Sequence, residues 1–255
     1  MTKVSDVWAN NKGRTLFICD FSPPRGGEKS VLEQANKVSA DFISVAYSPG
    51  KSVRADSMVV AHFLNQSDQR GVIFNLACRD MNKLAIQNHL LDAHMLGLDN
   101  VLVLQGDEFN EQDTMNVKDV SDYRPTKLIQ GICNLNEGVD FRNRKLRTPT
   151  SFCIGSTIDL NLANSDRQAL LAHKKVTSGA DFLITQTFYD VNKARAFLDA
   201  YQRLTSKDLN IPIFYGLQVL EKGGIFFGEV PSSVQYDLSK GRSGRDIALE
   251  QLQSY

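Results

Sequence analysis

Seven short apolar runs recur along the chain, and their spacing constrains the fold more than any other feature of the sequence. They are TLFIC near residue 15, DFISVAY from 41, GVIFNLAC from 71, NVLVLQG from 100, TSFCIGS from 150, DFLITQT from 181 and IPIFYGL from 211. Most are about 30 residues apart, the length of one strand, one helix and two short loops. The runs are apolar throughout rather than alternating, which is typical of parallel strands covered by helices. The spacing therefore predicts an α/β fold of repeated strand–helix units.

Segments with helical periodicity lie between these runs. The residues 83–97 and 167–179 are the strongest candidates, a third spans 123–135, and GRDIALEQLQSY is the last. In the first of these the apolar face is predicted to consist of Leu84, Leu91, Met95 and Leu96. Gly97 and Gly179 stand where C-terminal helix caps belong.

A TIM (β/α)8-type barrel is the simplest way to close such a repeat, although an eighth strand is not evident in this chain. The sequence is read as a single domain over 1–255, either C-terminally truncated or with its eighth position filled unconventionally. An open doubly wound sheet would usually carry a glycine-rich phosphate turn after its first strand, and none is present. SPGKS at 48–52 resembles the end of a phosphate loop, but that motif needs a glycine where Val45 stands.

Composition indicates an ordinary globular protein. The 255 residues are 42% apolar and carry 29 basic and 29 acidic side chains, so the chain can bury a full core and has no polyelectrolyte character. The densest basic cluster, FRNRKLR at 141–147, is short and contains no interleaved aromatic residues, which argues against nucleic acid as a partner. No apolar stretch of about 18 residues and no signal peptide are present, so no membrane partner and a cytoplasmic location are expected.

Cysteine and histidine spacing predicts no metal site. The cysteines, at positions 19, 78, 133 and 153, contain no Cys-x-x-Cys pair, and we interpret them as reduced thiols near buried strands. The histidines, at positions 62, 89, 94 and 173, include no pair four residues apart and no HExxH motif.

Three of the predicted strands end on residues able to carry chemistry. Asp20 follows FIC and precedes two prolines, Asp107 follows VLVLQG, and Gln186 lies in DFLITQTFYD. In a parallel barrel these ends meet at one mouth, where barrel enzymes place their active sites. Partial desolvation would raise the pKa of Asp20 toward that of a proton donor, whereas Asp107 and Gln186 suit the edge of a heterocycle. Alternatively, Asp20 caps the following loop and Gln186 is structural.

Several longer segments resemble the methylenetetrahydrofolate reductase family in the same order, from about residue 14 to 217. They are FICDFSPPRG, DFISVAYSPGKS, NLACRDMNKLAIQNHLLDAHMLGLDNVLVLQGD, LNEGVDFRNRKLRTPTSFCIGS and KKVTSGADFLITQTFYD. The resemblance implies an eightfold barrel with bound FAD. The flavin would take hydride from NADH or NADPH and pass it to 5,10-methylenetetrahydrofolate, giving 5-methyltetrahydrofolate for methionine synthesis. Homo-oligomers are common in the family.

The resemblance also implies roles for individual residues. Asp20 stands where the family has a glutamate acid that helps open the folate ring, Asp107 at an aspartate facing pterin and flavin, and Gln186 at a folate-contacting glutamine. Positions that line the flavin are Ala46, Tyr47, Asn75, Gln105, Gly106, Asp107 and Lys175. Folate contacts are Asp107, Gln186 and a stacking aromatic residue, for which Phe226, or its neighbour Phe227, is the candidate.

Departures from the family pattern leave three hypotheses open. Asp20 is one methylene shorter than the family's glutamate, Asn75 replaces a histidine and Ala46 a threonine. Gln168 and Leu171 replace an aspartate and an asparagine on the adenine side of FAD. The chain is accordingly a flavin-dependent reductase, an enzyme that moves hydride directly from NADH without flavin, or a non-catalytic folate-binding or partner-dependent relative.

Overall fold

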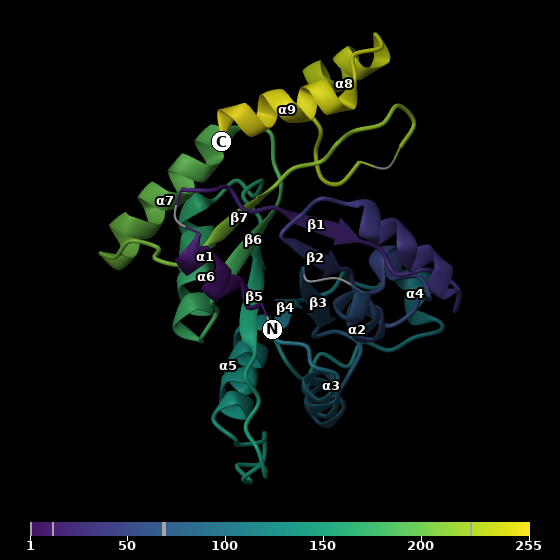
Figure 1. The fold of residues 1–255 in the computed structure, drawn as a ribbon. Coiled ribbons are helices and arrows are strands. Elements are labelled where there is room, and N and C mark those ends of the chain that lie inside the picture. Colours follow the sequence, from purple (N-terminus) through teal and green to yellow (C-terminus); the bar gives the residue numbers. More distant parts are fainter. Residues whose placement is uncertain (1, 12, 68–69, 225) are drawn as a thin grey trace. The chain divides into compact units, whose positions relative to one another are not determined.

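The computed structural model of the protein describes residues 2–11, 13–67, 70–224 and 226–255. Its strands are β1 (Ile18–Phe21), β2 (Phe42–Val45), β3 (Gly71–Ala77), β4 (Asn100–Leu104), β5 (Cys153–Ile158), β6 (Phe182–Thr187) and β7 (Ile213–Gly216) (Figure 1). They follow one another in sequence order in a single 7-stranded sheet. The pairs β1–β2, β2–β3, β3–β4, β4–β5 and β6–β7 are parallel. The predicted α/β fold of TIM-barrel type is therefore confirmed, and the described residues contain no eighth strand.

Helices connect the strands. They are α1 (Val4–Asn10), α2 (Ser57–Ser67), α3 (Lys83–Met95), α4 (Glu111–Thr114), α5 (Pro125–Asn136), α6 (Ser165–Thr177), α7 (Val191–Thr205), α8 (Ser232–Ser239) and α9 (Gly244–Ser254), with 3-10 segments η1 (Lys29–Lys37) and η2 (Pro49–Lys51). The predicted helices correspond to α3, α5, α6 and α9. Gly97 and Gly179, at φ +77° and +108°, follow α3 and α6 as the predicted caps.

The contacts divide the chain into two compact units. The first contains Met1–Ser156 and Lys175–Phe182, and the second contains Thr157–Lys174 and Leu183–Tyr255. Neither unit is continuous in sequence. The expectation of one domain over 1–255 stays a prediction.

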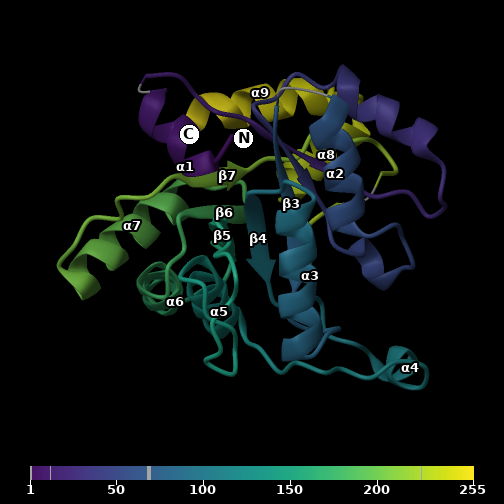
Figure 2. The same ribbon diagram turned by 60° about the horizontal axis from the view of Figure 1, so that its bottom comes forward.

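The core of the first unit lies between its strands and its helices. Side chains from alternate positions of β3 and β4, such as Phe74 and Val101, pack with Ile86 and Leu90 of α3 and with residues of α2 and α5. Figure 2 shows α3 running alongside β3 and β4. Each of these four side chains is completely buried, as expected of a helix-covered face.

The buried face of α3 differs from the predicted one. Its buried residues are Ile86, Gln87, Leu90 and Ala93, whereas Leu84 and Met95 are 51% and 85% exposed. The predicted apolar face was wrong because the buried face is centred on Ile86 and Leu90 and includes a polar residue, Gln87. Gln87 is buried with both ends of its amide satisfied: Nε2 donates to Tyr123 Oη at 3.2 Å, and Oε1 accepts from the Phe141 backbone N–H at 2.9 Å.

Two phenylalanine rings lie over glycines on neighbouring strands of the first unit. Phe42 on β2 faces Gly71 on β3, its partner in the strand register. Phe182, at the start of β6, covers Gly155 on β5. A Cβ atom at either glycine would overlap the ring, and both rings are fully buried. The glycines therefore make room for large side chains that fill the interior.

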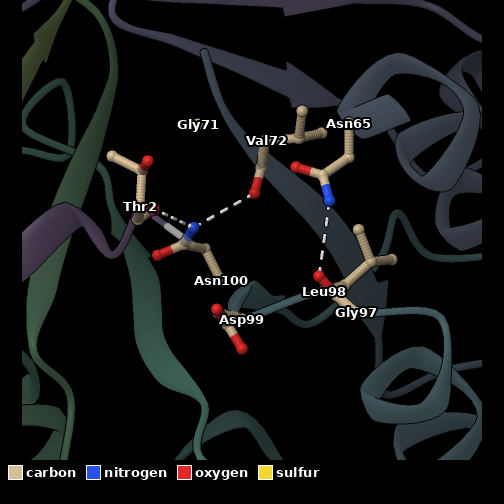
Figure 3. A pocket seen from close by; sticks show the side chains of 8 residues that line it. All are labelled: Thr2, Asn65, Gly71, Val72, Gly97, Leu98, Asp99 and Asn100. Atoms are coloured by element: carbon tan, nitrogen blue, oxygen red, sulfur yellow. Dashed lines mark hydrogen bonds between the residues drawn. The ribbon is translucent and has the colours of Figure 1, made fainter. Parts of the chain in front are cut away.

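The amino ends of β3 and β4 are tied to the N-terminal segment by Asn100 (Figure 3). Asn100 Nδ2 donates to the carbonyl oxygens of Thr2 at 2.9 Å and Val72 at 3.2 Å, and Asn100 Oδ1 accepts from the Val4 backbone N–H at 3.0 Å. The side chain is only 2% exposed. At the amino ends of the strands, Asn100 thus stabilises the fold, as is typical of that end of barrel proteins.

We expect Asn100→Ala to lower the free energy of unfolding by about 1–2 kcal/mol, because it removes the side-chain partner of buried backbone groups of Val4 and Val72 and of a partly buried one of Thr2. Asn65→Ala is the matched control. Its amide lies in the same pocket and makes one long bond, 3.4 Å, to the Gly97 carbonyl oxygen, so a loss below about 0.5 kcal/mol is expected. Urea denaturation of both variants measures the difference, and equal losses would contradict the assigned role.

Candidate functional site

The carboxyl ends of β1 to β4 place most of the predicted site residues in the first unit. Asp20 lies on β1, Ala46 and Tyr47 follow β2, and Asn75 lies on β3. Gln105, Gly106 and Asp107 follow β4 directly, and Lys175, on α6, belongs to the same unit. Parallel strands in register bring their carboxyl ends to one edge of a sheet, which accounts for this grouping.

Asp20, Ser44 and Asn75 form a polar row across three adjacent strands. Asp20 is the register partner of Ser44, and Ser44 Oγ donates to Asn75 Oδ1 at 3.2 Å. Ser44 and Asn75 are buried, whereas Asp20 keeps part of its surface in contact with solvent. Neighbouring protein desolvates the Asp20 carboxyl group and raises its pKa, and a hydrogen bond with Ser44 partly opposes that shift. The row thus presents an acid whose pKa is higher than that of a free aspartate.

Tyr47 and Asp107 are joined through a charged pair that follows β3. Burial raises the pKa of Tyr47, as do the charge of Asp80 and a hydrogen bond to it, so the phenol is neutral. Arg79 Nε pairs with Asp80 Oδ1 at 2.5 Å, and Arg79 Nη1 donates to the Asp107 carbonyl oxygen at 2.7 Å. The residues after β2, β3 and β4 therefore form one connected polar network.

Gly106 has a backbone conformation that favours glycine. Its φ is +86°, and a Cβ atom would lie 3.1 Å from Arg79 Cβ and 3.3 Å from Ala77 Cβ. Any side chain here would strain the backbone and crowd Arg79. Gly106 thus lets the chain pass close to Arg79 and Ala77 just before Asp107.

Lys175 supplies a buried amine. It is 5% exposed, and burial lowers its pKa to about 8, while the nearby Cys78 thiol acts in the opposite direction. Burial in turn raises the pKa of Cys78 to about 12, so this thiol is neutral. An anionic group next to Lys175 would further favour its charged form.

Gln186 and Phe226 belong to the second unit. Gln186 is exposed near the end of β6, and its carbonyl oxygen accepts from Thr185 Oγ1 at 2.8 Å. Phe226 lies in the segment after β7 and is 38% exposed. The joint placement of Gln186 with Asp20 and Asp107 stays a prediction.

Metal-binding and membrane-spanning features were also sought. Within the described ranges, no group of three or more His, Cys, Asp or Glu side chains is placed to hold a metal ion. No helix in the described part of the chain is both long and apolar enough to cross a membrane.

Sequence reasoning missed the polar residues that support the predicted ones. Ser44 was not singled out within DFISVAY, and Arg79 and Asp80 were part of a segment that resembles the family but were given no role of their own. Two opposite charges directly after a fully buried strand were the available signal, because that position lies at the functional end of a parallel sheet.

Comparisons with known proteins agree with one another. A profile of the methylenetetrahydrofolate reductase family matches residues 4–222. Methylenetetrahydrofolate reductase 1 of Schizosaccharomyces pombe is 22% identical over 227 residues, covering 86% of this chain and 36% of the relative. Methylenetetrahydrofolate reductase (NADH) 1 of Arabidopsis thaliana is 24% identical over 226 residues, covering 81% and 35%. The chain thus spans about a third of the length of these relatives.

Solved structures with the same fold include two proteins of low identity. An uncharacterized protein from Clostridium thermocellum, described as binding two copies of 5-methyl-5,6,7,8-tetrahydrofolic acid, has a TM-score of 0.66 at 14% identity, covering 98% of this chain and 85% of its own. A 2,3-dimethylmalate lyase has a TM-score of 0.55 at 9% identity, covering 97% and 79%. At these identities the likeness concerns the fold.

Proposed function

The chain belongs to the methylenetetrahydrofolate reductase family, and on this premise we propose that it reduces 5,10-methylenetetrahydrofolate to 5-methyltetrahydrofolate with electrons from NADH or NADPH. The observation that carries the proposal is the carboxyl group of Asp20, with its raised pKa, in the same compact unit as Asp107. NADH in the names of plant relatives supports that donor, and the folate-binding structural neighbour supports a folate ligand. The product carbon would then be available for methionine synthesis.

The residues of the first unit fit a flavin cofactor. Gly106 lets the chain after β4 turn close to Arg79, and an anionic part of the cofactor would stabilise the charged form of the buried Lys175 amine. Tyr47 contributes a neutral phenol fixed by Asp80. When bound, FAD would supply the hydride, while the protein contributes orientation, an acid and electrostatics.

Asp20 carries the acid role in the proposed reaction. Opening the five-membered ring of the substrate requires a proton on the leaving nitrogen, and a carboxyl group with raised pKa retains that proton closer to neutral pH. Asp107 would hold the pterin through hydrogen bonds, and the folate contacts expected of Gln186 and Phe226 stay predictions. Ser44, which also bonds to Asn75, would orient Asp20 from β2.

Anaerobic purification tests the proposal directly. We expect a flavin absorbance spectrum, NADH oxidation with menadione as acceptor, and reduction of 5,10-methylenetetrahydrofolate. Folate reduction without flavin absorbance would indicate direct transfer from NADH. Tight folate binding without any NADH oxidation would instead indicate a binding protein, an outcome given weight by Asn75 and Ala46 at altered flavin positions.

Lys175→Met is expected to weaken FAD binding by about 10- to 100-fold, because a charge-assisted hydrogen bond contributes roughly 1.5–3 kcal/mol. Lys174→Met is the matched control, since Lys174 is the adjacent residue of α6 and is exposed. Titration of the apoprotein with FAD, followed by fluorescence, gives both dissociation constants. Equal affinities in the two variants would remove Lys175 from the proposed cofactor site.

A further inference from the structure

A long loop follows β4, and hydrogen bonds tie both of its ends to one residue outside the loop, Arg79. At its start, the Asp107 carbonyl oxygen accepts from Arg79 Nη1 at 2.7 Å. At its end, the backbone N–H groups of Val120 and Ser121 donate to the Arg79 carbonyl oxygen at 3.0 and 3.4 Å. Residues 107–120 therefore form a loop whose two ends lie together, the arrangement of an Ω-loop.

The Arg79 side chain is rigidly held. It is 5% exposed, and Asp80 engages it through two bonds, Nε to Oδ1 at 2.5 Å and Nη2 to Oδ2 at 2.8 Å. The guanidinium carbon lies 4.2 Å from the ring centroid of Phe109. These contacts use the planar fork of donors and the stacking face that distinguish arginine from lysine.

Contacts to Arg79 concentrate around Asp107. A Cβ atom at Gly106, the residue before it, would lie 3.1 Å from Arg79 Cβ. The Asp107 carbonyl oxygen accepts from the guanidinium, and the Phe109 ring lies against that group. The Asp107 backbone thus has its direction set by Arg79, while its carboxylate remains exposed for a ligand.

We propose that Arg79 is a positioning residue for Asp107, which it holds by binding the Asp107 carbonyl oxygen and closing the 107–120 loop. The expected effect on folate reduction rests on the proposed function. The closed loop does not depend on that function.

A second anchor holds the tip of the loop. Lys51 Nζ pairs with Asp113 Oδ2 at 2.5 Å and donates to the Glu108 carbonyl oxygen at 3.2 Å. A capping box between Asn110 and Asp113 shapes the short α4 at that tip. Loss of the Arg79 side chain would therefore release the Asp107 carbonyl oxygen and the Phe109 ring, while Lys51 still holds Glu108 and Asp113.

The test compares Arg79→Gln and Arg79→Lys with Arg70→Lys. Arg70 also donates to backbone carbonyl oxygens, those of Val38 and Ala35, but it stands just before β3, at the opposite end of that strand from Arg79. We expect faster hydrogen exchange across residues 107–120 in both Arg79 variants, and kcat/KM for folate reduction lowered about 100-fold, the cost of misplacement by about 1 Å. The Arg70 variant should match wild type in both measurements.

Phe109→Ala is a second variant that weakens the same contact without replacing the buried arginine, because Phe109 lies in the loop itself. It distinguishes loss of positioning from a folding defect. It should give intermediate exchange and an increased KM with a nearly unchanged melting temperature. The positioning role would be overturned if hydrogen exchange of residues 107–120 in Arg79→Gln had the wild-type rate. It would also be overturned if exchange were faster but neither KM nor the dissociation constant for 5-methyltetrahydrofolate changed. If the wild-type protein reduces no folate, the proposed function fails, and loop exchange with folate binding still decides the role of Arg79.

Discussion

Asp20→Asn is expected to lower kcat for reduction of 5,10-methylenetetrahydrofolate by about 10²- to 10⁴-fold, the usual contribution of a positioned general acid. The amide keeps the size of the side chain and removes the proton that the leaving nitrogen requires. In the wild-type protein kcat should fall as pH rises through the pKa of Asp20, which burial raises above its ordinary value. The variant should lose that dependence, and steady-state kinetics across pH 5–9 measures both.

Stability distinguishes loss of the acid from damage to the fold. A carboxyl group with a raised pKa in the folded state binds a proton that the unfolded chain releases, so its contribution to stability falls as pH rises. Asp20→Asn removes this dependence, and its melting temperature at pH 8 should be no lower than that of wild type. Asp92→Asn, at an exposed position on α3, is the control and should leave kinetics unchanged. Full activity in Asp20→Asn would withdraw the acid assignment.

Gly155→Val should reduce the free energy of unfolding by about 3 kcal/mol, the upper end of the usual cost of overpacking a core. The new side chain would overlap the Phe182 ring, which is fully buried and has no room to move aside. Gly27→Ala is the control, because no atom lies near a Cβ at that position. Chemical denaturation gives both values.

A double mutant tests the cause of that loss. Phe182→Leu shortens the side chain over Gly155, so Gly155→Val with Phe182→Leu should cost less than the sum of the single changes. Additive losses would show that the clash lies with some other neighbour of Gly155.

The repeat of apolar runs was enough to predict the strands and the class of fold. Runs such as GVIFNLAC and NVLVLQG became β3 and β4 because burial on both faces requires apolar side chains throughout. The buried face of α3 was not predictable in the same way. Gln87 is buried only because Tyr123 and the Phe141 backbone, distant in sequence, meet its amide.

The candidate site shows a similar division. The sequence singled out Asp20, Gly106 and Asp107 as candidates because they lie at the ends of apolar runs, and their roles stay predictions. The role of Arg79 was not, because its bond to the Asp107 carbonyl oxygen depends on how β3 and β4 align.

The discontinuous make-up of the two compact units limits how the protein can be dissected. A fragment ending at Ser156 would keep Asp20, Asn75 and Asp107 but would lose the Lys175 amine and the Phe182 ring. Such a fragment would expose an empty space over Gly155 and lack the cation placed near Cys78. Deletion mapping or a split-protein reporter cut after Ser156 would therefore lose folding and ligand binding together. Point substitutions in the intact chain can separate the two effects.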